Sequence, residues 1–185
     1  MATQAALPNE LYGTISGIID QAAIQRIFGS FGFASQNGVL KAHVLFQSTG
    51  GGIGEGIALY NYFRALQIDL TLYNVGSVSS IAVVSYLGAR HRKVSRHAAF
   101  MIHRTQTTTQ AANTQTIKAF AESAVLFDKN TESILREHIK NLSAEKWAHF
   151  NHNDLWFSAD DAVKCGLADE IVDFAPPAGA RIYAL

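Results

Sequence analysis

Residues 42–66 read AHVLFQSTGGGIGEGIALYNYFRAL, and this stretch decides the fold class. It begins with a short apolar run, passes through a cluster of glycines and continues into a pattern of helical period. The same alternation occurs before it, at LYGTIS and DQAAIQRIFGSF, and after it, at DLTLYNVG and SSIAVVSYLGA. Strands that alternate with helices are typical of layered folds, so the chain is predicted to be an α/β protein with a largely parallel sheet.

The second half of the chain predicts a different set of elements. KVS and AAFMIH read as two strands joined at Arg96 and His97, and a long helical pattern follows from about Thr114 to Asn141. Polar Thr131 and His138 interrupt the apolar stripe of that pattern, which indicates a helix that faces a partner subunit as well as its own core.

Two shorter helices are expected near the end of the chain. Ser143 begins one of them, Ser158 and Asp161 form a capping-box-like start for the other, and Gly166 ends it. These residue types satisfy the free backbone groups at helix ends, so they predict boundaries as well as helices.

The composition excludes several classes of protein. The chain has 185 residues, with 15 Lys and Arg against 15 Asp and Glu, so it carries no electrostatic footprint for nucleic acid or an anionic membrane. Its start lacks the features of a signal peptide, and no apolar run approaches the ~20 residues that span a bilayer. Cys165 is the single cysteine and is interpreted as a packing residue. We therefore expect a soluble cytoplasmic protein.

The glycine cluster at residues 50–56 lies where a dinucleotide fold would carry its phosphate loop. It contains neither G-x-G-x-x-G nor G-x-x-x-x-G-K-[ST], so a nucleotide cofactor is not indicated. Without Cβ atoms, the backbone N–H groups of such a turn can approach a ligand closely, and donors aimed at one point suit an oxyanion. The alternative interpretation is a tight turn that only packs.

Ser79 and Ser80 stand where the strand DLTLYNVG gives way to a helix. Either could be an N-cap whose side-chain oxygen accepts a backbone N–H. A serine at such a turn also suits a nucleophile, because free N–H groups of the first helical turn lie beside the oxygen that becomes negative in acyl transfer. The two interpretations remain open at this point.

A serine nucleophile needs a base, and His103 is the candidate because it ends the apolar strand AAFMIH, at a strand end where sites are built. The other histidines are interpreted as surface or capping residues: His43, His91, His97, His138, His149 and His152. His149 and His152 have no third ligand for a zinc site. Asp154 taken alone is an ordinary loop aspartate.

Taken together, three segments resemble a known family. They are AHVLFQSTGGGIGEGIALYNYF at 42–63, LTLYNVGSVSSIAVVSYLGARHRKVSRHAAFMIH at 70–103 and DLWFSADDAVKCGLADEIV at 154–172. Their order and spacing are similar to those of the proteolytic-subunit (ClpP) family of the Clp protease, serine peptidases on the ClpP/crotonase fold. The resemblance implies one domain over residues 1–185, with a core at about 12–173. It also implies repeated β-β-α or β-α units, with a protruding strand and a long helix used for oligomerisation.

The resemblance implies a role for each matched residue. Ser80 takes the place of the nucleophile, His103 that of the general base, and Asp154 that of the aspartate that orients the base. The backbone N–H groups of Gly51 and Ile81 take the place of the oxyanion donors. Cleavage of a peptide would then pass through an acyl-enzyme.

The resemblance also implies substrate contacts and partners. An extended peptide would pair with two stretches, whose residues are Gly52, Ile53 and Gly54 on one side and Arg104 and Thr105, continuing to Thr107, on the other. The implied substrate is a peptide or an unfolded protein, with no cofactor and no metal. The implied assembly is a homo-oligomeric ring, heptameric or stacked, with an unfoldase ATPase as a partner.

The chain departs from the family pattern in four places. Thr49 replaces a proline, and Ile81 and Ala82 replace Met-Gly; these changes keep the N–H donors, so we expect a changed pocket and an intact mechanism. Residues 104–116 are rich in threonine and lack Q-P-L-G-G, and Asn153 replaces an arginine. Only about a dozen residues precede the first expected strand, so the axial loop that contacts the ATPase is short. Ring stacking and an ATPase partner are the expectations that these changes weaken.

Two alternatives accompany the peptidase interpretation. A crotonase-like acyl-CoA hydratase or isomerase would share the fold and the oxyanion hole, but it typically relies on glutamates, and Glu55 is the only acidic residue in the glycine turn. A non-catalytic ring subunit would carry the triad as a relic, and the presence of all three triad residues argues against it.

Overall fold

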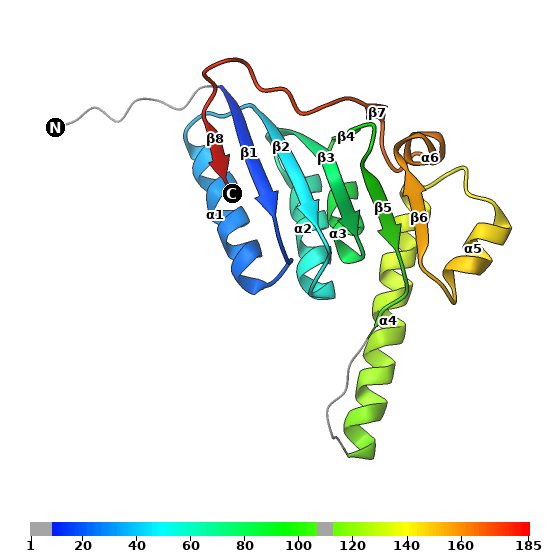
Figure 1. Ribbon diagram of the computed structural model, residues 1–185. Helices are drawn as coiled ribbons and strands as arrows, with labels where there is room; N and C mark the ends of the chain where they lie inside the picture. The colour runs from blue at the N-terminus through cyan, green and yellow to red at the C-terminus, as the bar shows by residue number, and fades with distance from the viewer. Residues whose placement is uncertain (1–8, 107–112) are drawn as a thin grey trace.

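The computed structural model describes residues 9–106 and 113–185. Within them, one sheet carries helices packed on one of its faces, and a long helix projects beyond the sheet (Figure 1). The strands are β1 (Glu10–Ser16), β2 (Lys41–Ser48), β3 (Asp69–Ser79), β4 (His91–Val94), β5 (Ala99–Ile102), β6 (Leu155–Ser158), β7 (Glu170–Ile171) and β8 (Ile182–Ala184). The helices are α1 (Gln21–Gln36), α2 (Ile53–Ala65), α3 (Ile81–Leu87), α4 (Thr114–His138), α5 (Ala144–Phe150) and α6 (Ala159–Cys165).

The sheet has the strand order β6-β5-β3-β2-β1-β8, with β4 and β7 branching from β3. All of these pairs are parallel except β5 and β6. Helices α1, α2 and α3 each connect one parallel strand to the next, as such connections require. The predicted α/β class and the largely parallel sheet are confirmed.

Burial along the central strands explains why they form this sheet. In β2, Ala42, Val44 and Phe46 are fully buried while the residues between them are partly exposed. This alternation has the period of two that a half-covered strand requires. The buried side chains join those of α2 and α3 in one hydrophobic core, which fixes the carboxyl ends of β2 and β3 beside the starts of the two helices.

The predicted helix ends are confirmed for α5 and α6. The hydroxyls of Ser143 and Ser158 accept the N–H groups of Lys146 and Asp161, and Gly166 ends α6 in the left-handed region at φ +83°. Cys165 is buried in α6, as expected for a packing residue. The long helix is shorter than predicted, because α4 ends at His138, before Asn141.

Residues 104–106 follow β5 without regular structure. The expected protruding strand would continue from them into residues 107–112, which lie outside the described residues. None of the helices in the described ranges combines the length and the apolar character needed to cross a membrane. In the same ranges, no three acidic, histidine or cysteine side chains cluster as metal ligands would.

His138 is half-buried and not a surface residue, so its predicted placement was wrong. Its Nδ1 lies 3.2 Å from Nη1 of Arg92, and its Nε2 lies 3.1 Å from the hydroxyl of Tyr60. Because a guanidinium only donates, Nδ1 must be the acceptor and Nε2 must carry the proton. Burial and the neighbouring Arg92 lower the pKa of His138 from 6.5 to about 4. A neutral imidazole therefore connects α4 to β4 and α2.

This arrangement predicts that acid weakens the fold through His138. Below pH 6.5 the unfolded chain protonates this residue while the folded chain stays neutral down to about pH 4, so the stabilisation is present at neutral pH and is lost as the pH falls through this window. We expect His138→Gln to be less stable than wild type at pH 7.5, and the difference to shrink by pH 5. Urea unfolding at the two pH values measures it, with exposed His97→Gln as the control. A difference that stays constant with pH would contradict the prediction.

Candidate active site

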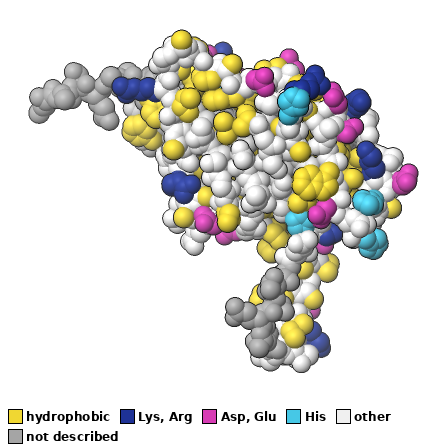
Figure 2. Space-filling view, in the orientation of Figure 1, with side chains coloured by type: hydrophobic (Ala, Val, Ile, Leu, Met, Phe, Trp, Pro, Cys, Tyr) yellow, Lys and Arg dark blue, Asp and Glu magenta, His cyan; other side chains and the backbone are white. Residues whose placement is uncertain are grey.

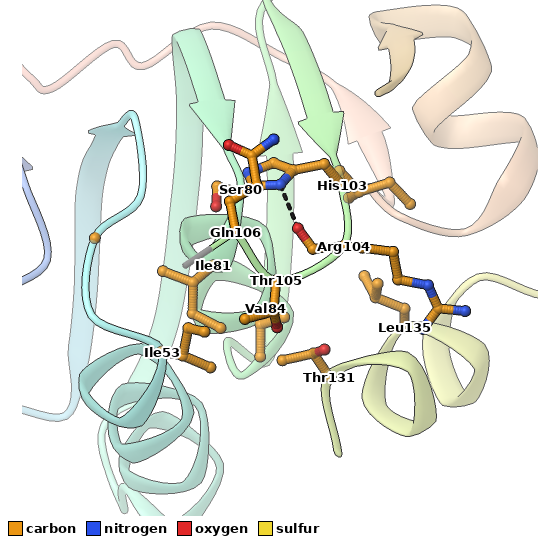
Figure 3. Close-up of a pocket in the computed structure, with 12 residues that line it drawn as sticks. Ile53, Ser80, Ile81, Val84, His103, Arg104, Thr105, Gln106, Thr131 and Leu135 are labelled. Atoms are coloured by element: carbon orange, nitrogen blue, oxygen red, sulfur yellow. Dashed lines mark hydrogen bonds between the residues drawn. The ribbon is translucent and has the colours of Figure 1, made fainter. Parts of the chain in front are cut away.

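A cavity of about 70 Å³ lies beyond the carboxyl ends of β3 and β5 (Figure 3). The starts of α2 and α3, the segment after β5 and one face of α4 surround it. Polar and apolar groups line it in similar measure: Ile53, Val84 and Leu135 contribute hydrocarbon, and Ser80 and His103 contribute polar groups. Ligand sites of open α/β sheets are built at this edge of the sheet.

Ser80 occupies the turn from β3 to α3 and is half-buried. Its backbone has φ 60° and ψ −135°, and it is the only residue other than glycine with positive φ in the described part of the chain. Such a conformation costs about 1–3 kcal/mol and persists only where the surroundings enforce it. Although Ser80 stands at the N-cap position of α3, its side chain makes no capping hydrogen bond. The capping interpretation is therefore wrong for Ser80, and its Oγ is free for chemistry.

The other serines of the turn have a different environment. The hydroxyls of Ser77 and Ser79 lie 3.1 Å apart and pair with each other. Ser79 is buried, and neither serine lines the cavity. Of the three, only Ser80 presents to the cavity a hydroxyl that pairs with no other group of residues 9–106 and 113–185.

The glycine turn lies directly against Ser80. A Cβ on Gly50 would come within 2.7 Å of the Cβ of Ser80, so the approach requires glycine. Gly51 has φ 151°, and a Cβ there would lie 2.2 Å from the carbonyl oxygen of Ile19. Two hydrogen bonds hold the glycine turn against Ile19. The Ile19 N–H donates to the Gly50 carbonyl at 2.9 Å, and the Gly52 N–H donates to the Ile19 carbonyl at 2.8 Å. The glycines thus bring two chain segments together as well as forming a turn.

Gly51 and Ile81 both line the cavity beside Ser80. Within the described residues, the backbone N–H of neither donates a hydrogen bond to another protein group. Unpaired N–H groups that border a cavity next to a hydroxyl are the arrangement that stabilises an oxyanion.

His103 follows β5, and its ring lines the same cavity as Ser80. Its Nδ1 lies 2.5 Å from the carbonyl oxygen of Arg104. Because a carbonyl can only accept, Nδ1 carries the proton and Nε2 is left as the basic nitrogen. No hydrogen bond joins His103 to Ser80 across the described chain; catalytic hydrogen bonds are frequently long in free enzymes and shorten when substrate binds.

Asp154 immediately precedes β6. The antiparallel register pairs Ile102 with Leu155. By the same register, His103, which follows Ile102, lies opposite Asp154, which precedes Leu155. Asp154 is exposed, and among residues 9–106 and 113–185 no hydrogen bond joins it to His103. The structure thus brings Ser80 and His103 to one cavity and leaves Asp154 opposite His103 with no hydrogen bond between them in the described part of the chain.

The expected substrate-binding residues differ in their surroundings. Ile53 and Gly54 belong to the first turn of α2, so they offer no extended edge, and Gly52 already donates its N–H to Ile19. Ile53 instead contributes an apolar side chain to the cavity. Arg104 and Thr105 follow β5 and line the cavity, whereas Thr107 lies outside the described residues.

Helix α4 contributes cavity residues that sequence reasoning missed. Thr131 and Leu135 line the cavity from α4, and Val84 lines it from α3. The hydroxyl of Thr131 donates to the carbonyl of Phe127 at 2.9 Å, so its methyl group is the part available to the cavity (Figure 3). The only signal in the sequence was that Thr131 interrupts the apolar stripe of the long helix.

Charged residues fix the segment after His103 to α4. Arg104 pairs with Glu132 at 2.7 Å, and Glu132 also accepts from Arg136 at 2.7 Å. Burial alone would raise the pKa of Glu132, but the hydrogen bonds from Arg136 and Arg104 outweigh it and hold the pKa below its ordinary value. Thr105 donates its N–H to Asp128 at 2.7 Å. The described part of α4 is therefore a wall of the site as well as a projection.

Comparison with known proteins shows which family this chain is similar to. Residues 5–175 match the family model described as Clp protease. Two curated relatives named ATP-dependent Clp protease proteolytic subunit come from Streptococcus pneumoniae. The protein of strain 70585 is 26% identical over 162 residues, which is 85% of this chain and 82% of the relative. The protein of strain Hungary19A-6 is 27% identical over 141 residues, which is 75% of this chain and 71% of the relative.

A solved structure gives the same fold. A point mutant of ClpP1 from Listeria monocytogenes superimposes with a TM-score of 0.76, covering 90% of this chain and 92% of that one. The sequence identity of this pair is 18%, so the match is one of fold.

Proposed function

The chain belongs to the Clp protease family and is a ClpP-type serine protease, and from this premise we propose that it cleaves peptides or unfolded proteins with a Ser80, His103 and Asp154 triad. The observation that carries the proposal is the state of Ser80. Its hydroxyl caps no helix, its backbone is held in a strained turn, and two unpaired N–H groups and a basic imidazole nitrogen share its cavity in the described part of the chain.

The proposed chemistry follows from these positions. His103 Nε2 takes the proton of Ser80 as Oγ attacks the peptide carbonyl, and the N–H groups of Gly51 and Ile81 stabilise the oxygen that becomes negative. The proton then passes from His103 to the leaving amine, which departs and leaves an acyl-enzyme. Water, deprotonated by the same imidazole, releases the acyl group and restores Ser80. Asp154, which precedes β6 and lies opposite His103 in the antiparallel register, would turn toward the ring and stabilise the imidazolium.

The cavity supports a preference for apolar side chains next to the cleaved bond. Ile53, Val84 and Leu135 offer hydrocarbon to it, and Thr131 offers a methyl group. Burying an apolar side chain there would contribute to binding, whereas a charged one would lose its hydration without a partner. Arg104 and Thr105, at the side of the cavity next to β5, are proposed to hold the peptide backbone through the Arg104 N–H and the Thr105 carbonyl, because the peptide group between them is bound to His103 and Asp128.

Self-association into a ring, heptameric or stacked, is part of the proposal. Apolar side chains that are about half or more exposed lie on the projecting α4: Ile117, Phe120, Val125 and Leu126. Figure 2 shows such side chains along that projection. Exposed apolar groups gathered on one element mark an interaction site. An unfoldase ATPase would then supply extended substrate, as the name of the S. pneumoniae relatives indicates an ATP-dependent protease for those proteins.

Labelling with a fluorophosphonate tests the proposal. We expect the probe to modify Ser80, identified by mass spectrometry of the tryptic peptide, in protein whose light scattering shows a particle well above 20.1 kDa. Absence of labelling in the assembled protein would contradict the triad. Labelling of Ser77 or Ser79 instead would contradict the assignment of the nucleophile.

A further inference from the structure

The peptide group between Arg104 and Thr105 joins the proposed base to a carboxylate on α4. Its carbonyl oxygen accepts from His103 Nδ1 at 2.5 Å, and its N–H donates to Asp128 Oδ1 at 2.7 Å. In a trans peptide the C=O and N–H bonds point in opposite directions. Asp128, the amide and the imidazole therefore form one chain of hydrogen bonds that ends on the ring proposed to act as base.

Side-chain contacts of Arg104 hold this peptide group in place. Its guanidinium pairs with Glu132 at 2.7 Å, lies 4.7 Å from the ring centre of Phe150 and donates to Asn151. These contacts come from α4 and from the end of α5, so the amide is anchored on two sides. Rotation of the peptide plane would break the bond to Asp128 and move the carbonyl away from His103.

The carboxylate of Asp128 affects the ring through this amide. A negatively charged acceptor on the N–H polarises the peptide group and makes its carbonyl a stronger acceptor, because hydrogen bonds in a chain reinforce one another. A stronger acceptor at Nδ1 fixes the tautomer in which Nε2 is free to take a proton, and it stabilises the imidazolium that forms.

We propose that Asp128 is a positioning residue for catalysis, which acts through the Arg104–Thr105 peptide group to hold His103 with Nδ1 protonated and Nε2 facing the Ser80 side of the cavity. The proposal rests on the proposed function, in which His103 is the base. It gives the imidazole a second source of orientation beside Asp154, and it assigns the role to a carboxylate that does not line the cavity of Ser80 and His103.

Charged groups of both signs lie around His103 and the segment that follows it. The titratable and charged groups that face it or its partners are Arg104 on its own segment, Asp128, Lys129, Glu132 and Arg136 on α4, and Asp154 before β6. Asp128→Asn removes one negative charge from this set and retains an oxygen that can accept from Thr105. Asp128→Ala removes both the charge and the acceptor.

The kinetics of peptide cleavage as a function of pH test the proposal. For Asp128→Ala we expect kcat to fall about 10- to 100-fold with little change in KM, because the base loses its orientation. For Asp128→Asn we expect most of kcat to remain. In both variants the acid limb of kcat/KM should move to lower pH by roughly half a unit, because the imidazolium loses a stabilising negative charge and the neutral base persists at lower pH.

Glu122→Ala is the matched control, since Glu122 is an exposed carboxylate on the same helix, and it should behave as wild type. Should Asp128→Ala fail to fold, the acid limb of Asp128→Asn decides. Suppose that the Asp128 variants fold and assemble and that their Ser80 is still labelled. If the acid limb of their kcat/KM profile then stays where it is in wild type, this proposal alone is overturned, even if their melting temperature falls. A wild-type protein whose Ser80 is not labelled overturns the triad and this proposal with it.

Discussion

Ser80→Ala is expected to lower peptide cleavage by about 10⁴- to 10⁶-fold, which in practice means below detection, because the acyl-enzyme cannot form without the hydroxyl. Stability should stay the same or rise slightly. Within the described residues the Ser80 side chain makes no hydrogen bond that alanine would lose, although alanine keeps the strain of φ 60°. Hydrolysis of a fluorogenic peptide, followed with the melting temperature and the particle mass, measures both effects.

Ser79→Ala is the matched control for this loss. Ser79 is the preceding residue, and its hydroxyl pairs with Ser77, so its removal should leave the nucleophile intact. Cleavage that survives in Ser80→Ala and disappears in Ser79→Ala would overturn the assignment. The Ser80→Ala variant also distinguishes a peptidase from an acyl-CoA hydratase on the same fold, because the hydratase would use the oxyanion donors without the serine. The family match does not favour the hydratase.

Gly51→Ala is expected to lower kcat by about 100- to 1,000-fold, the cost of losing one oxyanion donor. A Cβ at Gly51 would lie 2.2 Å from the carbonyl oxygen of Ile19, and φ 151° is rarely adopted by L residues. The turn must therefore shift, and the Gly51 N–H moves away from the oxygen it would stabilise. The melting temperature should fall as well, because the hydrogen bonds between Ile19 and the glycine turn are disturbed.

The controls for this variant separate catalysis from folding. Gly29→Ala introduces the same methyl group at an exposed position of α1, where a Cβ meets nothing within 4 Å, and it should keep full activity. Fluorophosphonate labelling of Gly51→Ala should be slowed along with cleavage, because the same donors assist attack on the probe. A folded Gly51→Ala protein with wild-type kcat would exclude this N–H from the oxyanion hole.

Local sequence patterns predicted much of the fold. The alternation of apolar runs, the caps at Ser143 and Ser158 and the stop at Gly166 act over a few residues, so they can be read from the chain and the structure confirms them. The strand ending in Ile102 and the glycine turn after β2 are also local features. They indicated where an active site would form, and resemblance to a family then singled out Ser80 from its neighbours.

Long-range packing decided what local patterns left open. Ser80 has the residue type and position of a helix cap, but the junction of β3, α3 and the glycine turn holds it at φ 60°, where its hydroxyl is free. His138 resembled a surface residue until folding placed it against Tyr60, 78 positions away in sequence. Such contacts depend on how whole elements pack, which no short window of sequence encodes.

The difference between local and long-range information is largest around His103, the proposed base. The order of residues along the chain is enough to predict that His103 ends a strand and that a long helix follows. Packing of the folded chain is needed to bring Asp128 of that helix to the N–H of Thr105, 23 positions earlier in the sequence and two residues after His103. In the sequence, Asp128 has no local feature that distinguishes it from Glu122. Its partner is a backbone N–H whose position depends on how α4 packs against α3 and against the segment after β5.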